Sequence, residues 1–413
     1  MPGKPQPAWN QKERIIGEGA AGRQFSLLAP PFSRCILAAQ STIGAIGRDM
    51  KIKSIKATIH QVHARVPLLK HPLQRKIVFC EVETDDGHKG CGLTGGAYLP
   101  LAITTALNKE FLQVVKDMDP RDTEAIHEKV WWKMNQRSMT GVISSALSCV
   151  DIACWDIHGK VTGRTVAQLL GGARDWAPTY CTFGFPEYDR EQLVQAAKDR
   201  LAEGHRRLKL VVAVDKGGWM EDARRVRLVR DAVGPDIEIM IDANYKFQPV
   251  EAKLLCREIE DCNLTWFEEP LYANDARAMA DLRRSTRIPL AAGQMEGHRW
   301  RLRELIDRQA VDIIQPNCCY NGGYTETQKV AHMAQMYNLP IANGGGWPLF
   351  NMHSMAGLMN GWRVEFHLDM QDIGEQVFVN PPRPENNIVK IPTAPGLGLT
   401  PNFNALKDSR IAE

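Results

Sequence analysis

Hydrophobic and polar positions alternate along the first segments that look structured. The alternation runs through Met50–Ile59 and Lys76–Asp85, and it is typical of strands with one buried face. Asp86-Gly87 is a hairpin turn signal, and the segment Lys89–Gly92 returns after it. The pattern therefore predicts an antiparallel sheet near the start of the domain.

A helical pattern follows this predicted sheet. Hydrophobic residues recur at helical spacing from Ser144 to Lys160, and we expect the helix to stop near Gly159. A further helix is expected to end at Leu169-Leu170-Gly171-Gly172. Strands followed by helices predict an α+β domain over residues 50–175.

After Ala177 short hydrophobic runs alternate with helical patterns, which is typical of a parallel sheet. The eight expected strands lie near residues 179–183, 208–212, 239–243, 265–268, 289–292, 312–315, 340–342 and 362–366. Strands in this number can close a barrel. An open doubly wound sheet is less favoured, because no glycine-rich phosphate loop follows any of them. We expect the tail from Pro381 to fold back onto the first domain.

Three of the expected barrel strands end in an oxygen-bearing side chain: Asp242, Glu268 and Gln294. Each is separated from the next by 26 residues, the length of one strand plus one helix. In a closed barrel these side chains would converge at the C-terminal mouth, where oxygen ligands suit a hard cation such as Mg²⁺. Gln294 stands where a third carboxylate would be expected.

Composition favours a small-molecule partner. The 413 residues are 44% hydrophobic and 24% charged, as in a globular protein with a barrel and an accessory domain. The net charge is only +3 and no basic stripe is present, so we expect neither nucleic acid nor a membrane as partner. No hydrophobic run approaches the ~20 residues of a membrane span, and we expect a cytoplasmic protein. The ten cysteines lack a C-x-x-C pair, so we expect reduced core residues.

Residues 1–49 differ from the rest of the chain. They are rich in proline at the start and in glycine and alanine further on, and the first strand pattern begins only at Met50. We expect this leader to be disordered or to be a wrongly assigned start, since a targeting segment is only weakly marked.

Seven segments together resemble a known family: Glu81–Gly87, Val150–Lys160, Leu169–Gly172, Ile241–Asn244, Trp266–Pro270, Gln315–Gly323 and Pro395–Gly398. Over residues 50 to about 405 the chain resembles the mandelate racemase and muconate lactonizing enzyme group of the enolase superfamily. The resemblance implies an α/β fold, a modified (β/α)₇β barrel of the TIM type with an N-terminal α+β capping domain. The expected parts are the capping domain 50–175, the barrel 176–380 and a segment 381–413 that completes the cap.

The resemblance also implies a chemistry. Members of the group abstract a proton α to a carboxylate, and Mg²⁺ stabilises the resulting enediolate. By position the metal ligands here are Asp242, Glu268 and Gln294. Two carboxylates and one amide carry a formal charge of −2 rather than −3, so we expect weaker metal binding and stronger polarisation of an anionic substrate.

The usual bases of the group are replaced. The Lys-x-Lys motif of the second barrel strand is Lys209-Leu210-Val211 here, so valine stands where the proton-abstracting lysine is expected. Asn317 and Asn343 stand at the ends of the sixth and seventh strands, where relatives carry an Asp or Lys and a His. Two-base racemisation is therefore disfavoured.

The remaining candidates form two sets. The candidate catalytic residues are Lys209, Glu365, Tyr320 and His353. Lys209 acts either as a base with a depressed pKa or only as a positioning group for substrate, and Glu365 matches a family acid that binds the substrate carboxylate. The candidate substrate-binding residues are Tyr98, Asn244, Asn317, Asn343 and Trp347. Tyr245, His298 and His367 also lie beyond strand ends, where a packing role is the alternative. The loops at residues 66–75 and 93–98 are expected to supply specificity.

We therefore predict a Mg²⁺-dependent lyase or isomerase that acts on a sugar acid or hydroxy acid by dehydration or cycloisomerisation. Two alternatives stay open: a catalytically silent homologue that binds a ligand, and a racemase or epimerase with non-standard bases. A homo-oligomer is expected by resemblance.

Overall fold

The structure, a computed structural model, describes residues 50–95, 99–134, 140–214 and 217–411. The chain divides into residues 1–48 and residues 49–413, and every described element belongs to the second unit. The predicted leader 1–49 and the candidate residue Tyr98 lie outside the described residues. Within the described part, no helix is long and apolar enough to cross a membrane.

An antiparallel sheet of three strands opens the described chain. It consists of β1 (Ile52–Ala64), β2 (Leu73–Thr84) and β3 (Lys89–Gly95), paired in the order β1-β2-β3. The β2–β3 hairpin turns at Gly87, whose φ of 92° suits glycine. The predicted sheet and its turn are confirmed.

Helices cover one face of this sheet. They are α2 (Pro100–Thr105), the π-helical η1 (Ala106–Phe111), α3 (Leu112–Val115), α4 (Thr123–Lys133), α5 (Val142–Thr162) and α6 (Val166–Leu169). The central helix α5 packs directly on β3. The contact is so close that a Cβ on Gly92 would lie 2.0 Å from the Cys149 carbonyl oxygen, so only glycine fits there. The expected helix end at Gly159 is wrong: α5 continues to Thr162 and Gly163 caps it with φ 68°. Gly159 instead allows close packing, since a Cβ there would lie 2.5 Å from the Cα atom of Gly396.

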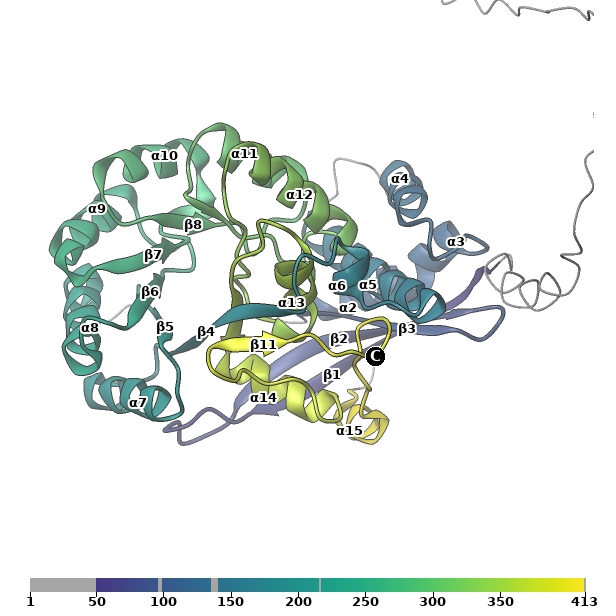
Figure 1. Ribbon diagram of the computed structural model, residues 1–413, viewed down its shortest axis with the longest axis horizontal. Helices are drawn as coiled ribbons and strands as arrows, with labels where there is room; N and C mark the ends of the chain where they lie inside the picture. Colours follow the sequence, from purple (N-terminus) through teal and green to yellow (C-terminus); the bar gives the residue numbers. More distant parts are fainter. Residues whose placement is uncertain (1–49, 96–98, 135–139, 215–216, 412–413) are drawn as a thin grey trace, which may run out of the picture. The chain divides into compact units, whose positions relative to one another are not determined.

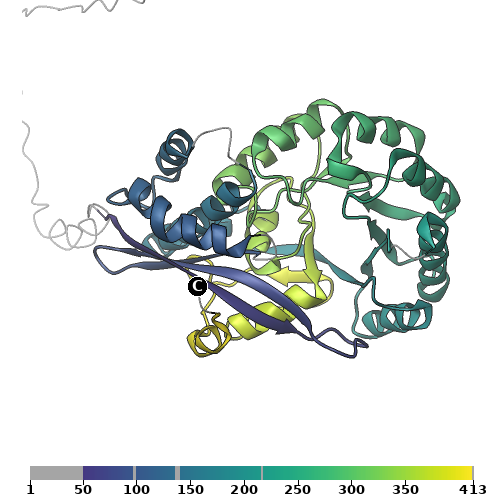
Figure 2. The ribbon, with the colours of Figure 1, turned by 180° about the vertical axis from the view of Figure 1, so that it is seen from behind.

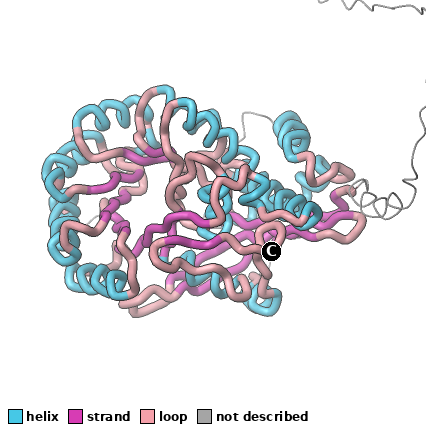
Figure 3. Tube along the Cα trace, in the orientation of Figure 1, coloured by secondary structure: helices cyan, strands magenta, loops and turns pink. Residues whose placement is uncertain are grey.

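The second part is a curled parallel sheet surrounded by helices. Its strands are β4 (Trp176–Gly184), β5 (Arg207–Val211), β6 (Glu238–Asp242), β7 (Leu264–Glu268), β8 (Leu290–Ala292), β9 (Ile313–Ile314) and β10 (Val364–His367). The helices are α7 (Arg190–Ala202), α8 (Gly218–Val233), α9 (Pro249–Glu258), η3 (Glu260–Cys262), η4 (Tyr272–Asn274), α10 (Ala276–Ser285), α11 (Arg299–Asp307), α12 (Tyr324–Met336), α13 (Pro348–Gly357) and α14 (Leu368–Val377). Figure 1 shows helices α7 to α12 on the outside of the strands, and Figure 3 shows the same separation in colour.

The sheet runs in the order β10-β4-β5-β6-β7-β8-β9, and the gap between β9 and β10 is bridged by residues 340–343. The Ala342 amide donates to the Ile314 carbonyl at 3.1 Å, and the Asn343 amide donates to the Arg363 carbonyl at 2.7 Å. The strand expected at residues 340–342 is therefore reduced to single bridges at Ile341. Its neighbours explain this, since Pro340 lacks an amide donor and a glycine run follows Asn343.

Side chains fill the inside of the curled sheet. Tyr180, Met240, Trp266, Ala291, Ile313 and Ala342 form one buried cluster from successive strands. The rings of Tyr180 and Trp266 meet edge to face at 5.1 Å. The sheet is thus closed below by packed side chains, and space for a ligand remains at the carboxyl ends of the strands. The nine cysteines of the described chain are buried and form no disulfide.

The C-terminal tail contacts both parts. β11 (Ile388–Lys390) pairs antiparallel with β4, and α15 (Phe403–Ser409) packs near β1. The Ile411 amide donates to the Ile59 carbonyl at 3.0 Å. Figure 2 shows α14 and α15 beside the N-terminal sheet.

Candidate active site

A cavity of about 350 Å³ lies at the carboxyl ends of the barrel strands. Asp242, Gln294 and Glu365 line it from the barrel, and Arg75 and Lys76 line it from β2 of the capping sheet. The cavity therefore carries several charged groups of both signs, as a site for a small polar ligand requires.

Lys209 lies at the point where three carboxylates meet. It is fully buried on β5, and its Nζ atom lies 3.1 Å from Asp242 Oδ2, 2.6 Å from Glu268 Oε1 and 2.8 Å from Glu365 Oε1. Parallel register brings these residues together, because Lys209, Asp242 and Glu268 stand at or near the ends of adjacent strands. The structure thus brings four predicted site residues into one cluster.

Two roles were considered for Lys209, a base with a depressed pKa and a positioning group, and its surroundings raise the pKa instead of lowering it. Burial alone would lower the pKa of its ammonium, but the carboxylates of Asp242, Glu268 and Glu365 raise it well above its ordinary value. In this arrangement Lys209 is a cation that balances buried negative charge, and this favours the positioning role.

Gln294 follows β8 and faces the same cluster. Its Nε2 atom donates to Glu269 Oε2 at 2.9 Å, which orients the amide so that Oε1 faces the other way. Two glycines let the next loop approach these oxygens. A Cβ on Gly344 would lie 2.9 Å from Glu268 Oε1, and one on Gly345 would lie 3.3 Å from Gln294 Oε1.

The donor set fits a hard divalent cation. Asp242 and Glu268 could supply carboxylate oxygens, and the oriented amide of Gln294 could supply a third oxygen. The described residues contain no group of three His, Cys, Asp or Glu side chains placed to bind a metal. A metal site here therefore depends on the amide oxygen of Gln294.

Glu269 is a further acidic residue beside the candidate metal ligands. It is fully buried, accepts hydrogen bonds from Gln294 and from Asn274 Nδ2 at 2.9 Å, and has a backbone φ of 40°. Burial and the charge of Asp242 raise its pKa to about 7. Its place directly after Glu268, at the carboxyl end of β7, is the signal that could have identified it.

Glu365 is held by donors from three directions. Thr182 Oγ1 donates to its Oε1 atom at 2.5 Å, Lys209 contacts the same atom, and the Gly346 amide donates to Oε2 at 2.6 Å. Burial would raise the pKa of this carboxyl, but the neighbouring cations and donors lower it. Glu365 is thus a carboxylate that lines the cavity and anchors the 344–347 loop.

Asn317 and Asn343 serve that loop instead of the cavity. Both side chains are fully buried, and neither lines the cavity. The amide of Asn317 donates to the Gly344 carbonyl at 2.7 Å, and that of Asn343 donates to the same carbonyl at 2.9 Å. In this structure both side chains hold the loop that forms the wall, and a direct contact with substrate stays a prediction.

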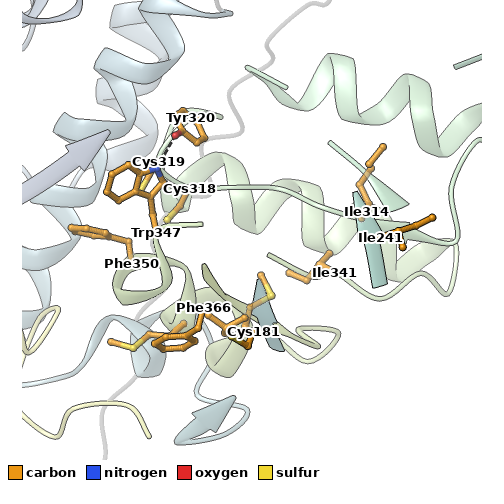
Figure 4. Close-up of a cluster of buried hydrophobic side chains, with 14 of the residues drawn as sticks. Cys181, Ile241, Ile314, Cys318, Cys319, Tyr320, Ile341, Trp347, Phe350 and Phe366 are labelled. Carbon is orange, nitrogen blue, oxygen red and sulfur yellow. Dashed lines mark hydrogen bonds between the residues drawn. The ribbon is translucent and has the colours of Figure 1, made fainter. Parts of the chain in front are cut away.

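Tyr320 and Trp347 form part of that wall. Both line the cavity, and Trp347 Nε1 donates to the Tyr320 hydroxyl at 2.7 Å, as Figure 4 shows. Asn244 also lines the cavity, and its backbone amide donates to Asp242 Oδ1 at 2.8 Å. Val211 occupies the usual base position on β5 and presents an apolar side chain to the cavity.

The histidines are distributed differently from the prediction. His353, the candidate catalytic histidine, lies in α13 away from the cavity lining, and its Nε2 atom lies 3.1 Å from the Leu397 carbonyl oxygen. Burial lowers the pKa of His353 to about 4, so it is a packed, neutral ring. His298 is also buried away from the cavity, against Glu326. His367, for which packing was an alternative, lines the cavity.

Comparisons with known proteins agree with this architecture. Residues 48–171 match the family described as mandelate racemase / muconate lactonizing enzyme, N-terminal domain, and residues 192–405 match the one described as enolase C-terminal domain-like. An arabinonate dehydratase of Saccharolobus solfataricus is 29% identical over 343 residues, which is 81% of this chain and 90% of the relative. A D-galactarolactone cycloisomerase of Agrobacterium fabrum is 30% identical over 383 residues, which is 88% of this chain and 100% of the relative.

A solved structure supports the same assignment. It is described as a variant of an L-talarate/galactarate dehydratase liganded with Mg and L-glucarate. It has a TM-score of 0.79 and 25% sequence identity, and the match covers 94% of this chain and 97% of that one. The chain therefore belongs to the mandelate racemase and muconate lactonizing enzyme group of the enolase superfamily.

Proposed function

We propose that this protein is a Mg²⁺-dependent enzyme that removes the proton α to the carboxylate of a sugar acid and expels an oxygen from the neighbouring carbon. Dehydration or cycloisomerisation is the outcome. Two relatives at 29% and 30% identity are named as a sugar acid dehydratase and a sugar acid lactone cycloisomerase, which supports this reaction class.

The convergence of Asp242, Glu268 and Gln294 beside Lys209 carries the proposal. These three ligands would hold Mg²⁺ through oxygen atoms. When bound, Mg²⁺ supplies positive charge against the negative charge that develops on the substrate carboxylate as the α-proton leaves. The relative solved with Mg and L-glucarate supports the choice of metal and of substrate class.

The chain's own residues would bind and orient the acid. Lys209 adds a buried positive charge near the cavity floor, and Arg75 and Lys76 bring two more from the capping sheet. Trp347 offers an aromatic face on the opposite wall, suited to a sugar ring or chain. Together these groups favour an anionic, polyhydroxylated ligand.

The proposal is tested by incubating the purified chain with Mg²⁺ and a panel of sugar acids and their lactones in D₂O. Expected results are deuterium by NMR at the α-carbon of the recovered substrate, and accumulation of a 2-keto acid that carries deuterium at the neighbouring carbon. Asp242→Asn is expected to weaken Mg²⁺ binding by at least roughly tenfold in calorimetry, because one charged ligand is lost. Unchanged Mg²⁺ affinity in this variant would contradict the assigned metal site.

A catalytically silent, ligand-binding homologue is the second candidate, because Val211 occupies the usual base position on β5. Calorimetric binding of a sugar acid without deuterium exchange or product would favour it. We also propose a homo-oligomer, as the resemblance implies, and light scattering of the purified chain measures this directly.

A further inference from the structure

A histidine and an aspartate stand together at the cavity, outside the metal ligand set. His367 ends β10 and precedes α14, and its Nδ1 atom lies 2.6 Å from Asp369 Oδ1. Both residues line the cavity. Because Asp369 lies against Nδ1, Nε2 is the ring nitrogen available to a ligand in the cavity.

Asp369 is itself fixed from the capping sheet. Arg75 Nε, on β2, donates to Asp369 Oδ2 at 2.7 Å, and Asp369 is almost completely buried. Asp369 also stands in the first turn of α14, where the helix dipole favours a negative charge. Each carboxylate oxygen therefore has its own partner, His367 on one side and Arg75 on the other.

The surroundings make this imidazole more basic. Burial alone would lower the pKa of His367, but Asp369 raises it, and Glu365 on the same strand adds to this effect. Lys209 on β5 works in the opposite direction. Burial would raise the pKa of Asp369, but His367 and Arg75 hold it well below its usual range, so it remains a carboxylate.

Other proton acceptors at the cavity are occupied or unsuitable. Asp242 and Glu365 accept hydrogen bonds from Lys209 and from other donors. The guanidinium of Arg75 has only hydrogen-bond donors, and Lys76 is exposed to solvent. Among the described residues that line the cavity, His367 is the only histidine.

We propose that His367 is the base that accepts the α-proton of the substrate, with Asp369 and Arg75 as the positioning residues that orient it. This inference rests on the proposed function and supplies the base that Val211 cannot provide. The base then lies on β10 of the barrel, and Arg75 of the capping sheet holds the aspartate that orients it.

His367 alone can both remove the α-proton and return a proton to the departing oxygen. Neutral His367 takes the α-proton at Nε2 reversibly, and the C–H electron pair moves into the substrate carboxylate as an enediolate. When the enediolate collapses, this pair forms the C=C bond between the α- and β-carbons and the bond from the β-carbon to its oxygen breaks. His367 then gives a proton to the departing oxygen, which leaves as water in a dehydration, as a carboxyl group when a lactone opens or as a hydroxyl when a cyclic ether opens. The base returns to its neutral state, and the enol product tautomerises to the 2-keto acid.

The test compares His367→Asn with His332→Asn, a matched change at an exposed histidine of α12. Rates of α-deuterium exchange and of product formation are measured for each, together with thermal unfolding and Mg²⁺ affinity. We expect His367→Asn to slow both rates roughly 10²–10⁴-fold with Mg²⁺ affinity unchanged, and His332→Asn to leave them unchanged.

Asp369→Asn is the second variant and keeps the histidine in place. We expect slower exchange and, by NMR titration of the His367 ring in the metal-free chain, a pKa lowered by roughly one unit or more. A purely structural role of Asp369 would leave this pKa where it is. If His367→Asn does not fold, these two measurements on Asp369→Asn still decide the proposal.

The possible failures are distinguishable. Exchange by the native chain that persists within about threefold in His367→Asn overturns the base but leaves the proposed function standing. Absence of both exchange and product with the native chain on every acid overturns both. Exchange in the native chain and in His332→Asn, with loss in His367→Asn, supports both.

Discussion

At the scale of single residues, Lys209 shows how one cation makes a buried acidic cluster tolerable. Its ammonium contacts Asp242, Glu268 and Glu365, and all four side chains are buried. Unpaired charges in a protein interior cost several kcal/mol each. The three acids are therefore expected to depend on Lys209 whenever no metal is bound.

We predict that Lys209→Met destabilises the metal-free chain by about 3–5 kcal/mol, because the buried acidic cluster loses the cation that all three side chains contact. Urea unfolding measures this, and added Mg²⁺ is expected to restore part of the loss. Lys198→Met, at an exposed position of α7, is the control and is expected to stay within ~0.5 kcal/mol of the native chain. A similar stability for both variants would show that the acids are neutral without Lys209.

At the scale of elements, glycines set how closely the helix α5 approaches the β2–β3 hairpin. Cβ atoms on Gly90 and Gly92 would lie 2.1 Å and 2.0 Å from backbone oxygens of α5. Backbone atoms cannot move aside as a flexible side chain can, so the two elements would have to separate.

We predict that Gly92→Ala destabilises the chain by about 1–3 kcal/mol or more, as overpacking does in a close-packed core. Gly204→Ala is the comparison: no atom lies within 4 Å of its Cβ position, but its φ is +93°. That variant is expected to cost only about 1 kcal/mol of backbone strain. Thermal or urea unfolding of both variants measures the difference, and a smaller loss for Gly92→Ala would mean that the helix and the sheet adjust easily.

At the scale of the whole described unit, a buried ionic cluster joins the capping domain to the barrel. His127 of α4 contacts Asp151 of α5 at 2.8 Å and Glu326 of α12 at 3.6 Å. Glu326 also contacts His298 and Arg299 of the barrel. Burial alone would lower the pKa of His127, but the two carboxylates raise it to about 9.

This cluster predicts a pH dependence of stability. The folded pKa of His127 lies above the unfolded value of roughly 6.5. Its contribution is therefore fully present below about pH 6.5 and is lost as the pH rises through about 9. We expect the free energy of unfolding to fall by on the order of 2–3 kcal/mol across this window. In His127→Gln this part of the slope should be absent, while His332→Gln should keep it. Urea unfolding between pH 6 and 10 measures the slopes.

Glu326 sets the acid side of the same profile. Burial would raise the pKa of this carboxyl, but His127, His298 and Arg299 lower it to about 2. A lowered folded pKa gives stability that is present above the unfolded value of roughly 4.3 and is lost as the pH falls toward 2. Both contributions are complete only between about pH 4.3 and pH 6.5, so the contact between cap and barrel is expected to be most stable in this mildly acidic range.

Local pattern was sufficient for most of the elements and for the position of the candidate metal ligands at or just beyond strand ends. Alternation and turn signals depend on neighbouring residues alone, so the hairpin and most barrel strands were predictable. Equal 26-residue spacing placed Asp242, Glu268 and Gln294 at equivalent strand ends, because each β/α unit repeats the same geometry. The prediction that the helix ends near Gly159 was wrong, because this glycine serves close packing against Gly396, which is remote in sequence.

Only the tertiary structure decided which polar side chains face the cavity and which form hydrogen bonds within the protein instead. Asn317, Asn343 and His353 stand at or near strand ends in the sequence, yet their hydrogen bonds hold loops and packed helices. His367 has Asp369 as its partner, and that carboxylate is held in turn by Arg75, which lies about 290 residues earlier in the chain. Sequence patterns determine what lies within a few residues along the chain. The orientation of a side chain depends on contacts with residues that are distant in sequence, and a local pattern does not contain those contacts.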